Sequence, residues 1–215
     1  MTMRTISFGS VEGRFVFMDE GTDSYFSIET ELQADIERIV RDGGLLRSND
    51  RLRPVLGLAD EPIRIARADE MRPTRSLLEE LGLPRASLGG ILSLAYLLRS
   101  TRSQLRSRPI GAVLGDIFGC AGYRPICEPQ IDMALQFMAA RRFVPLRRNC
   151  LLDSLSMMRW LGGATKGVRI TFGVKLDPFA AHCWLQSGNL VLNDRTENVA
   201  AFTAVRVLGC LDPTQ

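Results

Sequence analysis

The first eighty residues open with short runs in which apolar and polar positions alternate. Runs rich in Phe, Val and Ile occupy residues 4–8, 14–18 and 24–28. Turn signals separate them: Gly9-Ser10 and Gly13 lie in the first gap, and residues 20–23 form the second. Alternation over runs this short is typical of half-buried strands. The sequence therefore predicts three antiparallel strands at the start of the chain.

The apolar spacing then changes to that of a helix. Apolar residues on one face predict a helix from Thr30, a possible cap, to about residue 41, before Gly43-Gly44. Residues 45–70 read as a possible short helix and an extended run at 63–67. Pro73 could open a further helix over residues 74–81. We place a domain boundary at Gly82-Leu83-Pro84, so residues 1–84 are predicted to form a small α+β domain.

The second part, residues 85–215, reads as helices followed by an antiparallel sheet. Helical spacing predicts four helices, at residues 88–107, 110–120, 130–141 and 150–161. The period then falls to two, which predicts strands at residues 168–174, 181–186 and 189–194. The chain as a whole is therefore predicted to be an α+β protein of two domains.

Charge supports this division. Apolar residues make up 46% of the 215 residues and charged residues 24%, which is typical of a folded protein. Up to Gly82 there are 11 Arg against 16 Asp and Glu, a net charge of −5; from Leu83 onward, 16 Arg and Lys against 8 Asp and Glu give +8. The basic half could attract an acidic partner or nucleic acid, or it could simply be a solvated face.

Targeting signals and cysteine usage both favour the cytoplasm. The N-terminus has no apolar signal-peptide core, and the longest apolar stretch, Leu88 to Leu98, is about half of what crosses a bilayer. The cysteines are odd in number and irregularly spaced, with no C-x-x-C pair, so we expect free thiols and no structural zinc. They are Cys120, Cys127, Cys150, Cys183 and Cys210.

The single histidine, His182, limits where imidazole chemistry can occur. It lies on a predicted strand that turns at Ser187-Gly188-Asn189. A three-residue loop centred on Gly188 would set His182 opposite Asp194, within hydrogen-bond reach. A two-residue loop would put the two side chains on opposite faces. The alternative is that His182 is an ordinary surface or core residue.

Cys150 is the best-placed candidate nucleophile. It begins a predicted helix, where unpaired N–H groups and the helix dipole favour a thiolate; Asn149 could cap that helix, and Arg147 and Arg148 add positive charge. Its backbone N–H could also serve as an oxyanion donor. The competing interpretation is a small residue in a core helix. Cys183 is expected to face away from His182, which argues against a metal site built from Cys150, His182, Cys183 and Asp194.

Three motifs together resemble the transglutaminase-like peptidase domain of lasso-peptide biosynthesis B proteins. They are RRNCLLDSLSMMRWL at a helix start, AHCWL on a strand, and ND on the returning strand. The resemblance implies Cys150 as nucleophile, His182 as general base and Asp194 as orienting residue, with no cofactor and no metal. One departure is Cys183, where a small apolar residue is expected.

The first domain resembles, over the shorter run DSYFSI, the PqqD-like leader-recognition module with its winged-helix fold. The resemblance implies that the leader of a ribosomally made precursor adds as a strand along Tyr25, Phe26, Ser27 and Ile28, beside the helix near residues 74–81. It also implies cleavage of the leader through a thioester and transfer of the core to an asparagine-synthetase-like cyclase that uses ATP. Neither nucleic acid nor a membrane is expected as a partner.

Two other functions stay open at the level of sequence. An acyl transferase on the same scaffold would share the acyl-enzyme and differ only in its acceptor. A binding protein without chemistry, directed at peptide or nucleic acid, would use the arginine-rich half.

Overall fold

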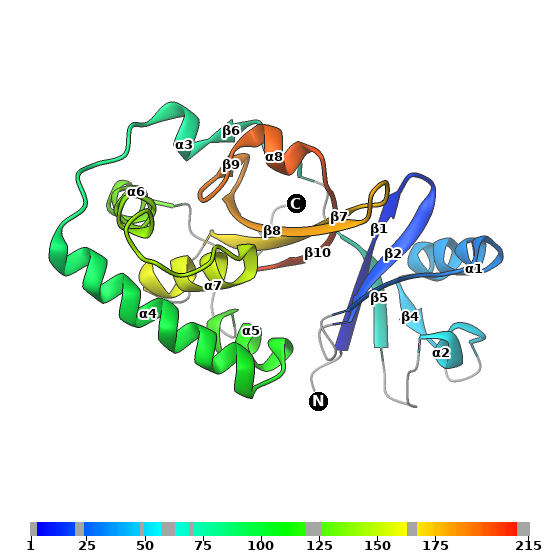
Figure 1. Ribbon diagram of the computed structural model, residues 1–215. Coiled ribbons are helices and arrows are strands. Elements are labelled where there is room, and N and C mark those ends of the chain that lie inside the picture. Colours follow the sequence, from blue (N-terminus) through cyan, green and yellow to red (C-terminus); the bar gives the residue numbers. More distant parts are fainter. Residues whose placement is uncertain are drawn as a thin grey trace.

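The computed structural model describes residues 4–19, 24–47, 50–56, 63–68, 71–118, 126–162 and 167–209. Cys120 and Cys210 lie outside these ranges. The described elements form two five-stranded sheets with helices packed around them (Figure 1). Among the described residues, no helix has both the length and the apolar character needed to cross a membrane.

The first sheet is mixed, with strand order β3-β2-β1-β5-β4. Its β1–β2–β3 meander is antiparallel, β5 runs parallel to β1, and β4 is antiparallel to β5. The helices that accompany it are α1 and α2. The bounds are β1 Arg4–Val11, β2 Arg14–Asp19, β3 Ser24–Ser27, α1 Thr30–Arg41, β4 Leu45–Leu46, α2 Leu52–Val55 and β5 Ile63–Arg67.

This sheet differs from the predicted three strands. The extended run at residues 63–67 joins the sheet next to β1, and residues 45–46 add β4 beside it. Local patterning identified the meander because its strands are neighbours in sequence, whereas the pairing of β1 with β5 is a long-range contact that periodicity does not reveal. A winged-helix fold is not confirmed by this architecture.

Both faces of the first sheet are buried. Phe15 and Phe17 of β2 point into a core beneath α1 with Ile36. Val16 and Met18, on the opposite face, belong to a core shared with the second half of the chain. This explains why β2 is apolar at successive positions rather than polar on one side. The two halves of the protein are therefore packed together.

The second sheet has strand order β10-β7-β8-β9-β6 and is antiparallel except for the pair β6–β9. Helices α4, α6 and α7 lie on one side of it, away from the first sheet (Figure 1). The bounds are β6 Arg75–Ser76, α3 Leu77–Glu80, α4 Leu88–Ser107, α5 Ile110–Phe118, α6 Glu128–Arg141, α7 Cys150–Trp160, β7 Arg169–Lys175, β8 Ala180–Ser187, β9 Leu190–Val191, α8 Thr196–Ala200 and β10 Thr203–Leu208.

A buried arginine holds the loop that leads into α7. The Arg141 side chain is 2% exposed and donates from Nε to Asp153 Oδ1 at 2.8 Å. Its other nitrogens donate to the carbonyls of Val144 and Leu146, each at 3.1 Å. The guanidinium thus ties the end of α6 and the following loop to the first turns of α7.

The segment just before the expected boundary at residue 84 contacts the second half of the chain. Ser76 of β6 pairs with Val191 of β9, and Leu77 of α3 is buried in the core shared by both halves. A helix was predicted for residues 74–81; the helical part is limited to Leu77–Glu80, and Ser76 caps it by accepting from the backbone N–H of Leu78. The partition at residue 84 stays a prediction.

Candidate active site

Cys150 is the first residue of α7, as the sequence predicted. Asn149 caps the helix, with its Oδ1 accepting from the backbone N–H of Leu152 at 2.9 Å. The Cys150 side chain is half-buried, and His182 is close enough to lower the pKa of its thiol. A sulfur atom at a helix N-terminus lies in a positive potential, which favours its thiolate form.

His182 lies on β8 and is held by Asp194. His182 Nε2 and Asp194 Oδ2 are 2.6 Å apart, and the two side chains are 21% and 19% exposed. Since Nε2 faces the carboxylate, Nδ1 is the nitrogen left for Cys150. The structure therefore brings together the three side chains that the sequence singled out, in the order Cys150, His182, Asp194.

The predicted strand register is nevertheless wrong. Gln186 pairs with Val191 and Ser187 with Leu190, so the turn has two residues, Gly188 and Asn189, rather than three. Gly188 adopts a positive φ of 55° in this turn. With that register, regular strands would separate His182 from Asp194, but β9 ends at Val191. Asp194 reaches the imidazole because it lies in the irregular chain beyond the strand.

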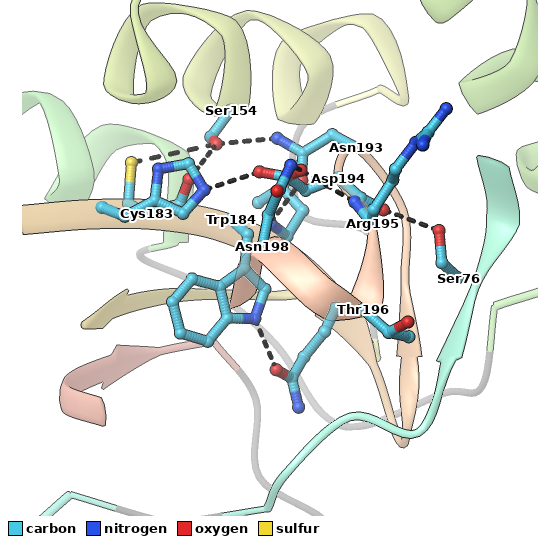
Figure 2. A network of polar contacts seen from close by, with 12 residues as sticks. Ser76, Ser154, Cys183, Trp184, Asn193, Asp194, Arg195, Thr196 and Asn198 are labelled. Atoms are coloured by element: carbon cyan, nitrogen blue, oxygen red, sulfur yellow. Dashed lines mark hydrogen bonds and ion pairs between the residues drawn. The ribbon is translucent and has the colours of Figure 1, made fainter. Parts of the chain in front are cut away.

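The side chain of Asn193 replaces the backbone hydrogen bonds between β8 and β9 where β9 ends, and it holds the chain next to Asp194. Its Oδ1 accepts from the backbone N–H of Leu185 at 2.8 Å, taking the place of a strand carbonyl. Its Nδ2 donates to Ser154 Oγ at 2.9 Å, which links the chain to α7 (Figure 2). Ser154 and Cys150 are four residues apart, so they share the face of α7 that meets β8.

Three further groups hold Asp194. Its Oδ1 accepts from the backbone N–H of Arg195 and from Asn198 Nδ2, both at 2.7 Å. Its backbone carbonyl accepts from Ser76 Oγ at 2.6 Å (Figure 2). One carboxylate oxygen is thus fully engaged by neighbours, which leaves the other aimed at His182. Sequence reasoning missed Ser76, Ser154, Asn193 and Asn198, because no local pattern links these positions.

Electrostatics favour an ion pair between Cys150 and His182. A hydrogen bond from the Cys183 side chain, together with His182 and the Cys183 backbone, outweighs burial and lowers the pKa of Cys150 to about 4. Burial lowers the pKa of His182, but Asp194 and Cys150 outweigh it and raise the value to about 9. Burial raises the pKa of Asp194, but its hydrogen bonds, first that of His182, lower it overall. At neutral pH the site is a thiolate beside an imidazolium.

Cys183 has a role that the sequence did not indicate. It was expected to face away from His182, yet both residues lie close enough to Cys150 to lower the pKa of its thiol. The Cys183 thiol is 3% exposed and lies 3.9 Å from Ser154 Oγ, under the first turns of α7. Because Cys150 sits above the strand, it is within reach of neighbours on β8 that point in different directions.

Two aromatic rings, those of Trp184 and Phe202, pack against the His182 imidazole. Its ring centroid lies 5.2 Å from that of Phe202 and 6.0 Å from that of Trp184. Gly173, the partner of His182 on β7, leaves room for these rings, since a Cβ there would come within 2.9 Å of both aromatic side chains. The imidazole therefore has a packed and fixed orientation.

The expected leader-binding residues lie elsewhere. Tyr25, Phe26 and Ser27 belong to β3, the outermost strand of the first sheet, and Ile28 is buried beneath it. The Tyr25 ring lies 6.1 Å from Phe179, in the turn between β7 and β8. The expected neighbouring helix near residues 74–81 is not beside β3: α3 packs against β6 and α6, across the second sheet from β1 and β2 (Figure 1).

Comparison with known proteins identifies one region. Within the parts of the chain that the structure describes, no group of three or more His, Cys, Asp and Glu side chains could hold a metal ion. No curated protein and no solved structure matches the chain. Residues 120–207 match the family model of the transglutaminase-like superfamily. The region that carries Cys150, His182 and Asp194 is thus transglutaminase-like, as in a superfamily that includes both cysteine peptidases and transglutaminases.

Proposed function

We propose that this protein is a cysteine peptidase that removes the leader from a ribosomally made precursor of the lasso-peptide type. The observation that carries the proposal is the arrangement of Cys150 at the start of α7, close to a His182 that lowers its pKa and that Asp194 holds at 2.6 Å. A nucleophile, a base and an orienting carboxylate in this order are the parts of a cysteine-peptidase site.

The proposed reaction has two halves. The Cys150 thiolate attacks the scissile carbonyl, and the developing oxyanion accepts a hydrogen bond from the Cys150 backbone N–H. The imidazolium of His182 gives its proton to the departing amine, and the leader remains as a thioester on Cys150. His182 then takes a proton from water, the hydroxide attacks the thioester, and the leader acid leaves while the thiolate returns. Asp194 keeps the ring oriented throughout.

The leader is proposed to bind along β3, through the backbone of Tyr25, Phe26, Ser27 and Ile28. Within the described part of the chain β3 has one sheet neighbour, β2, so its other edge can accept an added strand. The contact between Tyr25 and Phe179 connects this edge to the turn that precedes the strand of His182. We do not include residues 74–81 in the leader site, because α3 packs elsewhere.

The freed core peptide is proposed to pass to an asparagine-synthetase-like cyclase that closes a macrolactam with ATP. The peptidase step itself requires no cofactor, since a thiolate and an imidazolium supply nucleophile and acid. Neither nucleic acid nor a membrane is a proposed partner, and the cytoplasm is the proposed location.

The test is incubation of the protein with a synthetic leader–core peptide, followed by mass analysis of the products. Wild type should release a free leader acid, and Cys150→Ala should release none while still binding the leader. Cys127→Ala is the matched control, because Cys127 is an exposed thiol remote from His182 in the sequence and outside its contacts. Equal cleavage by Cys150→Ala and wild type would rule out the proposed nucleophile.

Acyl transfer is the second candidate, because the superfamily includes transglutaminases as well as peptidases. An amine acceptor replaces water, and the leader then leaves as an amide. Adding hydroxylamine or a primary amine to the same reaction separates the two candidates by product mass. A binding protein without chemistry would instead give no covalent product and salt-dependent retention on DNA.

A further inference from the structure

A cavity lined by arginines lies beside the candidate nucleophile. It has a volume of about 670 Å³ and lies between the end of α4, the start of α5 and the loop before α7. A volume of this size is in the range of ligand-binding pockets. We call it the arginine cavity, after the five arginines in its lining: Arg102, Arg106, Arg108, Arg147 and Arg148.

The arginine cavity reaches the residue next to Cys150. Asn149, Leu151 and Leu152 all contribute to its lining. Asn149 precedes Cys150 and Leu151 follows it, so both chain neighbours of the candidate nucleophile line the cavity, whereas Cys150 itself does not.

Among the residues that the structure describes, most of the arginines that line the cavity have no acidic partner. Arg108 pairs with Asp116 at 2.6 Å. Within the described ranges, no ion pair is formed by Arg102, Arg106, Arg147 or Arg148. Arg148 acts on Asp153 through its charge, but the Asp153 carboxylate is already paired with the buried Arg141 at 2.8 Å.

Unpaired guanidinium groups in a hollow favour a ligand that carries carboxylates. Guanidinium binds a carboxylate through two parallel hydrogen bonds, and like charges held close together attract acidic groups. The remaining walls are apolar, formed by Leu105, Ile110 and Leu151 among others, which suits the methylenes of an amino-acid side chain better than a compact phosphate.

We propose that the arginine cavity, at the N-terminal end of the helix that begins with Cys150, is a subsite for acidic side chains of the peptide substrate. This inference rests on the proposed peptidase function and deepens it, since it names the chemical class that the enzyme selects. The subsite would make the enzyme prefer peptide substrates that carry Asp or Glu.

Binding to the inactive variant Cys150→Ala tests the subsite without requiring cleavage. The probes are two rhodamine-labelled hexapeptides, Gly-Glu-Ala-Glu-Gly-Ala amide and its counterpart with Gln at both Glu positions. Fluorescence anisotropy at low salt should show at least about tenfold tighter binding of the Glu peptide, which corresponds to one added charge-paired contact. Adding Arg102→Glu or Arg147→Glu should lower that affinity about tenfold.

Arg99→Glu is the matched control, because Arg99 is an exposed arginine of α4 outside the cavity lining. It changes the net charge equally and should alter the affinity by less than about twofold. Thermal unfolding of each variant checks that it is folded, because substitutions of exposed residues rarely affect stability much.

Three results would overturn the subsite. They are equal binding of the Glu and Gln peptides, an equal loss of affinity in Arg99→Glu, or stronger competition by a ten-base oligonucleotide than by unlabelled Glu peptide. The experiments distinguish this failure from failure of the peptidase proposal. If the wild-type protein cuts no peptide but binds the Glu peptide through Arg102 and Arg147, the subsite stands and the peptidase function is ruled out.

Discussion

At the scale of single residues, the chemistry depends on the opposite charges of the Cys150 thiolate and the His182 imidazolium. The Cys183 side chain contributes most to the lowered pKa of Cys150, about 4, and Asp194 contributes most to the raised pKa of His182, about 9. In addition, each charged form of the Cys150–His182 pair stabilises the other. The Cys183 thiol and Asp194 extend the chain of hydrogen bonds on either side. A neutral thiol–imidazole pair would require both groups to give up these partners.

The pH dependence of Cys150 alkylation follows from these directions. Because its pKa in the folded protein is about 4, the thiolate is present above that value, and labelling by iodoacetamide should be flat from about pH 5 to pH 8. An ordinary thiol would gain about tenfold per pH unit over this range. Peptide mass spectrometry after timed labelling measures the rate at each cysteine.

His182→Ala should return Cys150 towards ordinary behaviour, with labelling at pH 6 reduced at least about tenfold. Cys127 serves as the internal reference in both proteins, because it is exposed. A wild-type Cys150 rate that climbs steadily from pH 6 to pH 9 would contradict the ion pair.

At the scale of elements, the approach of α7 to β8 determines the site, and the loop into α7 depends on Arg141. Burial raises the pKa of Asp153 although Arg141 lies 2.8 Å away, so neither charge of this pair is well solvated. Removing one partner of such a pair leaves a buried charge without compensation.

Arg141→Met should therefore lower the free energy of unfolding by about 3–5 kcal/mol, measured by urea denaturation. The double variant Arg141→Met with Asp153→Leu removes the stranded carboxylate and should recover part of the loss; the carbonyls of Val144 and Leu146 still lack their donor. A single variant within about 0.5 kcal/mol of wild type would show that the pair contributes little to folding.

The elements also show how far the sequence alone could go. Periodicity identified α1, α4, α6 and α7 and three strands of the second sheet, β7, β8 and β9, but it missed β6 and β10. The single histidine, the helix that begins at Cys150 and the family resemblance, rather than periodicity, pointed to the three residues that meet in the site. The register argument for His182 and Asp194 was wrong, however, because side-chain bonds of Asn193 replace the ladder where β9 ends. The Asn193 side chain is in turn held by Ser154, which lies thirty-nine residues earlier in the sequence, so local patterns do not reveal this arrangement.

At the scale of the whole molecule, the two sheets meet along β1 and β10. A Cβ built on Gly9 of β1 would lie 2.1 Å from the backbone oxygen of Ala204 on β10. Arg206 of β10 also donates to Ser7 Oγ of β1 at 3.4 Å. The approach is so close that it requires glycine at this position, which ties the packing of the two halves to a single residue.

Gly9→Ala should lower the free energy of unfolding by about 2–3 kcal/mol, because backbone atoms rather than a flexible side chain must move. Gly82→Ala is the control, since nothing lies within 4 Å of its added Cβ, and it should change stability by less than about 1 kcal/mol. Urea unfolding of both variants gives the comparison. Equal stability of the two would mean that the sheets can shift apart at little cost.

Strand β6 connects the N-terminal half of the chain to the second sheet. Arg75 and Ser76 come before the expected boundary in sequence, yet they complete the second sheet, and Glu79 beside them accepts from the backbone and hydroxyl of Thr196 at the start of α8. If a protease nicked the chain once between α3 and α4, the N-terminal fragment would keep β6 and supply it in trans. The two fragments would then stay associated as one particle, and the carbonyl of Asp194 would keep its bond to Ser76 across the break.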